Sequence, residues 1–249
     1  MLDPEILAAL FLIATVAGWI DAIAGGGGII MLPSLMLAGL SPLQALATNK
    51  LQACFGSGTS TLNFIAKRKI QLRDVWPGIA CTAVGAAAGT WTVQRISNDV
   101  LQQVIPVLLI ALSLFLLFGM KWLMQRTTPM VSYGVFALLI GGGVGFYDGF
   151  FGPGTGTLFA VGHMLLLGQN MVNATINTKL LNFTSNVVAL VFFLSGGHVL
   201  WVAGLVMALG QMLGAYVGSN MVIDKGTRLI RPLLIIMSLV ISIKLLLFP

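Results

Sequence analysis

Long apolar stretches alternate with short polar connections along almost the whole chain. Eight stretches are close to the ~20 residues that an α-helix needs to cross a bilayer, and they lie at residues 6–24, 42–66, 75–94, 100–120, 131–151, 171–195, 199–222 and 229–248. Two shorter apolar segments, 28–40 and 155–168, follow the first and the fifth stretch. This pattern predicts an all-α polytopic membrane protein with about 8–10 transmembrane segments. No polar stretch is long enough for a soluble domain, so we predict a single membrane domain over residues 1–249.

Composition supports a membrane environment and argues against a nucleic-acid partner. Hydrophobic residues make up 57% of the chain and charged residues only 8%, against roughly 25% charged residues in soluble domains. The net charge of +6 comes from cations in short loops, which is typical of the cytoplasmic loops of membrane proteins. We therefore expect contact with the lipid bilayer and no binding of nucleic acid.

Cysteine and histidine show no pattern of a metal centre or of an active site. Cys54 and Cys81 lie inside apolar stretches, and His163 and His198 are isolated in the sequence. Neither metal-ligand spacing nor a nucleophile with a nearby base can be recognised. The sequence therefore predicts no metal, no cofactor and no enzymatic activity.

Two glycine-rich motifs indicate an internal duplication. "GWIDAIAGGGG" begins at Gly18 and "GFYDGFFGPGTG" begins at Gly145. At a spacing of 127, Gly18, Asp21, Gly25 and Gly27 match Gly145, Asp148, Gly152 and Gly154. At a spacing of 129, Lys50, Leu51, Phe64, Gly85 and Gly89 match Lys179, Leu180, Phe193, Gly214 and Gly218. We interpret the chain as two pseudo-repeats, 1–122 and 131–249, joined by a cytoplasmic linker at 123–130. The two G-x-x-x-G pairs predict close helix packing.

The cation distribution favours opposite orientations of the two halves. Four cations lie between residues 67 and 73, but the equivalent loop of the second half, 196–198, is uncharged. In that half the cations are concentrated one helix later, at 225–231. Since cytoplasmic loops are enriched in Lys and Arg, we predict two inverted-topology repeats with both termini in the periplasm.

The glycine clusters predict a broken helix near the membrane midplane in each half. Irregular backbone survives in a bilayer only against protein or a water-filled cavity. A break exposes backbone N–H groups and the positive end of a helix dipole, an arrangement common at secondary-transporter sites. Close helix packing is the alternative explanation for the glycines. The sequence leaves open whether 28–40 and 155–168 cross the membrane or turn back.

One lysine and one aspartate in each half lie where charge is costly. Lys50 and Lys179 stand inside apolar helices, at a cost of at least ~2.5–3.5 kcal/mol each, and Asp21 and Asp148 are the acids beside the breaks. The four charges can form structural ion pairs or line an anion site, and the sequence does not show which Asp faces which Lys. Our candidate substrate-binding residues are Asp21, Gly25, Gly26, Gly27, Gly28, Thr48, Asn49, Lys50, Ser57, Asp148, Gly152, Gly154, Thr155, Gly156, Asn177, Lys179, Asn182 and Asn186.

Two further motifs follow the repeat: "ALATNKLQA" at 45–53 and "ATINTKLLNFTSN" at 174–186. Together with the glycine motifs, they resemble the TauE/SafE sulfite exporter family, also called the 4-toluene sulfonate uptake permease family. The resemblance covers both halves. It implies a transporter of small sulfur-containing anions, such as sulfite or sulfonates, in the bacterial inner membrane. It also places the anion region at Asp21, Gly25 to Gly28, Thr48 to Lys50, Asp148, Gly152 to Gly156 and Asn177 to Lys179.

We therefore predict a secondary transporter that exports a small anionic substrate. The chain has no ATP-binding motif, which argues against primary pumping by this chain alone. The alternatives are an anion channel, or a membrane assembly or structural protein without transport. A homodimer is compatible with the sequence.

Overall fold

The computed structural model describes residues 2–70, 72–119 and 128–226, and every regular element in these ranges is helical. The long helices are α1 (Pro4–Ala24), α3 (Pro42–Ala66), α4 (Leu72–Val93), α5 (Asn98–Gly119), α9 (Met171–Ser195) and α10 (Trp201–Lys225). The shorter elements are α2 (Gly27–Leu37), α6 (Tyr133–Phe136), the π-helical segment η2 (Ala137–Gly142), α7 (Gly143–Phe150) and α8 (Thr155–Leu167). The predicted stretch 229–248 and most of the linker lie outside the described residues.

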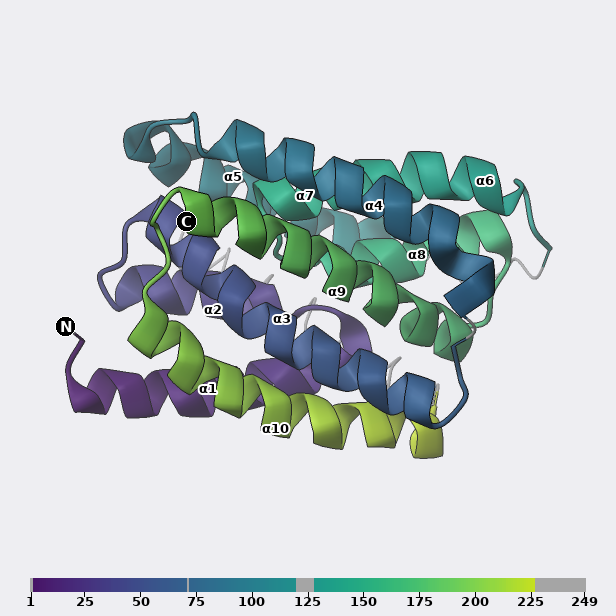
Figure 1. Ribbon diagram of the computed structural model, residues 1–249, viewed down its shortest axis with the longest axis horizontal. Coiled ribbons are helices and arrows are strands. Elements are labelled where there is room, and N and C mark those ends of the chain that lie inside the picture. Colours follow the sequence, from purple (N-terminus) through teal and green to yellow (C-terminus); the bar gives the residue numbers. More distant parts are fainter. Residues whose placement is uncertain (1, 71, 120–127, 227–249) are drawn as a thin grey trace.

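The architecture is that of a polytopic membrane protein, as predicted. Within the described ranges, four helical segments have the length and apolar composition of membrane spans: Pro4–Ala24, Tyr133–Phe150, Met171–Ser195 and Trp201–Lys225. Figure 1 shows α1 and α10 along one edge of the molecule, α4 with α6 and α7 along the opposite edge, and α3 and α9 between them. Although α3 is 25 residues long, it is less apolar, because its central position buries a face of Thr, Asn, Lys, Gln and Ser side chains.

The two central helices begin with equivalent caps. Ser41 accepts a hydrogen bond from the Gln44 backbone N–H at 3.4 Å, and the Gln44 side chain accepts one from Ser41 at 3.2 Å. At the start of α9, the Asn170 side chain accepts one from the Asn173 backbone N–H at 2.9 Å. Such caps satisfy N–H groups that have no partner within the helix. Ser41 and Asn170 stand 129 positions apart, so the caps follow the repeat.

Glycines at or just after the ends of α1 and α7 let the chain reverse direction. Gly25, with φ of 79°, ends α1, and a Cβ on Gly27 would lie 2.7 Å from the Ala17 carbonyl oxygen. Helix α2 therefore turns back along α1. In the second half, Gly152 (φ 98°) and Gly154 (φ 75°) make the reversal. The end of α8 returns to the start of α6, where the Leu166 carbonyl accepts a hydrogen bond from the Met130 N–H at 2.8 Å.

In both halves the short apolar segment thus runs back along the helix that precedes it. We call α1–α2 hairpin 1 and α6–η2–α7–α8 hairpin 2.

Each hairpin packs against a helix of the other half. Helix α1 lies on α10, where Gly210, Gly214 and Gly218 face the α1 backbone. Hairpin 2 lies on α4 in the same manner, with Gly85 and Gly89 facing its backbone. The close packing predicted for both G-x-x-x-G pairs is confirmed.

Equivalent central helices run in opposite directions (Figure 1). Lys50 near the start of α3 contacts Asn186, whereas Gly58, farther along α3, faces Phe183, which comes earlier in α9. This antiparallel arrangement is what inverted repeats would produce. The inverted-repeat relation itself and the periplasmic termini stay predictions.

Candidate functional site

The tips of the two hairpins meet in the interior of the bundle. The Thr157 hydroxyl donates a hydrogen bond to the Ala24 carbonyl oxygen at 2.7 Å, which ties the start of α8 to the end of α1. A Cβ on Gly156 would lie 2.5 Å from the Gly25 Cα, and a Cβ on Gly28 would lie 3.2 Å from the Pro153 Cα. At Gly25 and Gly156, the absence of a side chain allows the two backbones to approach so closely.

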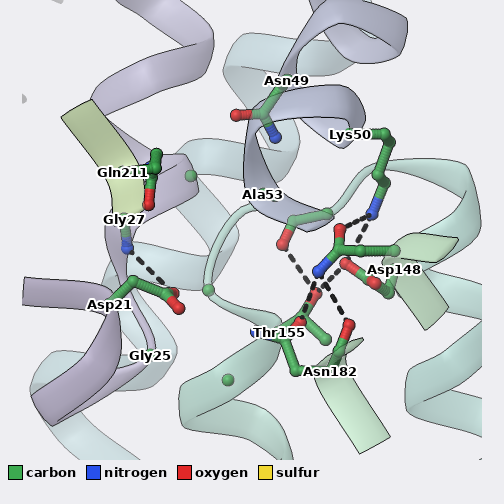
Figure 2. A pocket seen from close by; sticks show the side chains of 15 residues that line it. Asp21, Gly25, Gly27, Asn49, Lys50, Ala53, Asp148, Thr155, Asn182 and Gln211 are labelled. Atoms are coloured by element: carbon green, nitrogen blue, oxygen red, sulfur yellow. Dashed lines mark hydrogen bonds and ion pairs between the residues drawn. The ribbon is translucent and has the colours of Figure 1, made fainter. Parts of the chain in front are cut away.

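A small cavity lies beside the contact between the tips. Its volume is about 20 Å³, on the scale that holds a water molecule. Figure 2 shows the side chains of α1, α3, α7, α8, α9 and α10 that surround it. The lining residues are Asp21, Gly25, Gly27, Gly28, Asn49, Lys50, Ala53, Asp148, Gly152, Gly154, Thr155, Gly156, Asn182, Asn186 and Gln211.

The first charge pair of the site joins Lys50 to Asp148. The Lys50 Nζ lies 2.7 Å from Asp148 Oδ1, and both side chains are only 2% exposed. Lys50 also donates to the Asn186 Oδ1 at 3.2 Å, and the Thr155 hydroxyl donates to Asp148 Oδ1 at 2.7 Å. A buried charge needs such partners, because its desolvation is expensive. Lys50 is therefore a fixed cation in the cavity wall.

The second charge pair joins Lys179 to Asp21. The Lys179 Nζ lies 3.1 Å from Asp21 Oδ2 and also donates to the Asp21 backbone carbonyl oxygen. That carbonyl belongs to the last turn of α1, where the helix dipole is negative and a cation is favourable. Each lysine thus pairs with the aspartate of the opposite half, which settles the pairing that the sequence left open.

Two helices begin at the cavity wall. Gly27 and Gly28 form the first turn of α2, Thr155 and Gly156 form the first turn of α8, and all four line the cavity. The first N–H groups of a helix have no partner within the helix, and its N-terminus carries a partial positive charge. Together with Lys50, these helix ends make the wall suited to a small anion.

Comparison with known proteins shows what the chain is related to. The family model described as "Sulfite exporter TauE/SafE" matches residues 10–245. The chain belongs to this family. It is 49% identical to the "Probable membrane transporter protein YfcA" of Escherichia coli (strain K12), over 99% of this chain and 91% of the relative. It is 43% identical to a "Probable membrane transporter protein" of Haemophilus influenzae, over 96% and 94% of the two chains. No solved structure matches the chain significantly.

Membership of this family and the apolar helices make the chain a multi-pass membrane protein of a transporter family. That class is in keeping with a non-enzymatic protein. Within the described residues, no group of three or more His, Cys, Asp or Glu side chains could hold a metal ion.

The structure brings most of the predicted site residues of this family member together at the cavity and leaves five outside its lining. Gly26 precedes the first turn of α2. The Thr48 hydroxyl accepts a hydrogen bond from the Leu200 N–H at 3.1 Å, and Asn177 donates to the Gln169 side chain at 3.0 Å. The Ser57 hydroxyl bonds back to the Ala53 carbonyl at 2.6 Å. Lys179 holds the end of α1. These five positions lie outside the cavity lining.

Gln211 was missed by the sequence analysis. It lies on α10, is 4% exposed and lines the cavity. Its side chain fits against α1 and α3 because both have a glycine there: a Cβ on Gly18 or on Gly56 would lie 2.8 or 2.5 Å from the Gln211 Oε1. The repeat carried a usable signal, since the residue 129 positions earlier, Thr82, is also polar, is buried and faces the glycine equivalent to Gly18, which is Gly145.

Proposed function

We propose that this chain is a secondary transporter that exports small sulfur-containing anions, such as sulfite or sulfonates, across the bacterial inner membrane. One observation carries the proposal: Lys50 and the N-termini of α2 and α8 face one cavity where the two hairpin tips meet. Broken helices whose N-termini point at an anionic substrate are a recurrent design of secondary transporters. The family description supports sulfite as the type of anion.

The charge balance of the site suits a small anion. Asp21, Asp148 and Lys50 line the cavity and Lys179 stands next to Asp21, so the four formal charges cancel. A neutral set of charges does not repel an anion, while the helix N-termini and the amide groups of Asn49, Asn182 and Gln211 supply hydrogen-bond donors. The cavity is smaller than a sulfonate group, so binding requires the walls to part.

The hairpin tips are the elements best placed to move. They contact each other through glycine backbone and the hydrogen bond from Thr157 to Ala24. In alternating access, one repeat moves against the other around a fixed central site. We propose that separation of the tips widens the cavity and opens it to one side of the membrane. Such a backbone-to-backbone contact favours a transporter over the alternative of an anion channel.

The membrane potential favours export. Moving one negative charge outward gains ~2.3 kcal/mol per 100 mV when the inside is negative. An exporter of a monovalent anion therefore needs no coupled ion, whereas uptake would need cotransported cations.

The test is transport by the purified full-length chain in proteoliposomes. We expect saturable sulfite efflux with counterflow, and faster efflux when a potassium diffusion potential makes the interior negative. Large unitary currents in planar bilayers would instead identify a channel. Absence of both fluxes would support an assembly or structural role and end the transport proposal.

We also propose that the loop after α3 faces the cytoplasm and the loop after α9 the periplasm, with both termini periplasmic. In a variant with Cys54 and Cys81 replaced by serine, Lys69→Cys and Ser195→Cys place single thiols at exposed positions beside these loops. An impermeant thiol reagent added to intact cells should label only the Ser195→Cys protein. Labelling of the Lys69→Cys protein instead would reverse the orientation, and labelling of both would contradict the inverted-repeat model.

A further inference from the structure

The carboxylate of Asp148 has an uneven set of hydrogen bonds. Its Oδ1 receives both the Lys50 ammonium and the Thr155 hydroxyl, each at 2.7 Å. Its Oδ2 is fully buried, and no group in the described part of the chain donates a hydrogen bond to it. Asp148 is 1% exposed and belongs to the cavity lining. Figure 2 shows its carboxylate directed from α7 toward Lys50 and the surrounding lining residues.

The equivalent aspartate of the first half differs in this respect. Asp21 Oδ1 accepts a hydrogen bond from the Gly27 backbone N–H at 3.4 Å, and its Oδ2 accepts one from Lys179 at 3.1 Å. Both oxygens of Asp21 therefore have protein partners. The unpartnered oxygen is a property of Asp148 alone within this pair.

A buried acceptor without a donor carries a free-energy penalty that a ligand can remove. Leaving such a group unpaired loses the hydrogen bonds that it made in water, and the loss is larger for a charged group. A ligand in this cavity meets donors from Lys50 and the helix N-termini on its anionic part. Asp148 lines the same cavity and has one carboxylate oxygen without a donor in the described part of the chain.

We propose, on the basis of the anion-transport function above, that the preferred ligand is a monovalent anion with its own O–H or N–H group, which donates to Asp148 Oδ2. Hydrogensulfite and sulfamate, which carries an NH2 group on its sulfur, have this chemistry. A fully deprotonated dianion does not, and it would repel Asp148 without donating a hydrogen bond. The formal charges of Asp21, Asp148, Lys50 and Lys179 cancel, so they offer no second positive charge for a dianion.

The test uses two anions of equal charge and nearly equal shape. Sulfamate has an NH2 group where methanesulfonate has a CH3 group, so the pair differs in hydrogen-bond donation. Dissociation constants are obtained from thermal stabilisation of the purified protein, since a ligand that binds the folded state raises its stability with concentration. We expect sulfamate to bind about tenfold more tightly, as one hydrogen bond to a charged group predicts. Equal affinities, or tighter binding of methanesulfonate, would overturn the proposal.

Two matched variants locate the effect. In Asp148→Asn, the carboxamide oxygen should take the place of Oδ1, because the Lys50 ammonium needs an acceptor there. The amide NH2 then faces the ligand, and the preference for sulfamate should disappear. In Asp21→Asn, the absolute affinities can change, but the ratio should stay close to tenfold. If the preference for sulfamate disappears in Asp21→Asn but persists in Asp148→Asn, Asp21 would be the acceptor. That result would overturn the proposal.

The wild-type comparison remains decisive if Asp148→Asn does not fold. Failure of this inference can also be told from failure of the proposed function. If both anions stabilise the protein equally, the anion site stands and the donor requirement falls. If neither these anions nor sulfite stabilises the protein, and none is transported in proteoliposomes, the proposed function itself is wrong.

Discussion

The Lys50–Asp148 and Lys179–Asp21 pairs have the same residue types at equivalent positions of the repeat, but their surroundings differ. Lys50 lies in the cavity wall and bonds to the Asn186 side chain. Lys179 lies outside the lining and bonds to the Asp21 carbonyl oxygen in the last turn of α1. We propose that the two equivalent lysines have separate tasks: Lys50 attracts the anion, and Lys179 holds hairpin 1 in place. A symmetric sequence thus supports an asymmetric site.

The largest expected effect is on stability, when one partner of a pair is removed. Lys50→Gln leaves the Asp148 charge buried without its cation, which should cost about 3–5 kcal/mol and lower Tm by roughly 10 °C. Lys179→Gln should cost less, because the Asp21 side chain is 19% exposed and water can partly replace the lysine. Thermal unfolding of the purified variants measures both. A larger loss in Lys179→Gln would contradict this ranking.

The second effect concerns affinity in variants whose paired charges are both removed. Lys50→Gln/Asp148→Asn should fold, since no lone charge stays buried, but should bind sulfite about 100-fold more weakly, as expected for loss of a desolvated ionic contact. Lys179→Gln/Asp21→Asn, the matched control, should stay within about threefold of the unmodified protein, on the order of 0.6 kcal/mol. Equal losses in the two double variants would show that both lysines bind the anion.

The third prediction compares the stability effects of a substitution at the hairpin tip and at an ordinary turn. Gly25 and Gly39 both have positive φ, but a Cβ on Gly25 would collide with the Gly156 backbone, whereas a Cβ on Gly39 would meet nothing within 4 Å. Gly39→Ala should therefore cost only the backbone strain, about 1 kcal/mol. Gly25→Ala should cost about 2 kcal/mol more, from overpacking, and should slow sulfite counterflow. Similar stability of the two variants would mean that the tips do not pack as closely as described.

The smallest expected effect comes from Asn186 and its repeat equivalent Ser57, which stand seven residues after Lys179 and Lys50. Asn186 accepts the Lys50 hydrogen bond, whereas the equivalent Ser57, within the described residues, bonds to the Ala53 carbonyl oxygen of its own helix. Asn186→Ala should weaken sulfite binding about fivefold, on the order of 1 kcal/mol, because Lys50 loses one of the side-chain acceptors that fix it in the cavity wall. Ser57→Ala should change stability by less than about 0.5 kcal/mol and leave affinity unaltered. A stronger effect of Ser57→Ala would show that the first half contributes to binding through a contact absent from this structure.

The sequence by itself determined the helical membrane architecture, the positions of both helix breaks and the four intramembrane charges. Each of these follows from local physics. Apolar runs of bilayer length must form helices, because backbone groups have no water to bond with. Glycines such as Gly25 and Gly152 permit positive φ, and an intramembrane Lys50 or Lys179 requires a partner at depth.

Only the tertiary structure decided how these parts meet. The pairing of Lys50 with Asp148 and of Lys179 with Asp21, the return of α2 and α8, and the place of Gln211 depend on contacts between distant segments. The repeat offered each lysine two chemically identical aspartates, and an apolar segment of 11 or 13 residues has no pattern that shows which helix it packs against. Helix packing resolved these choices. Glycine stripes on α4 and α10 set each hairpin against the opposite half, and this packing brings each aspartate to the other half's lysine.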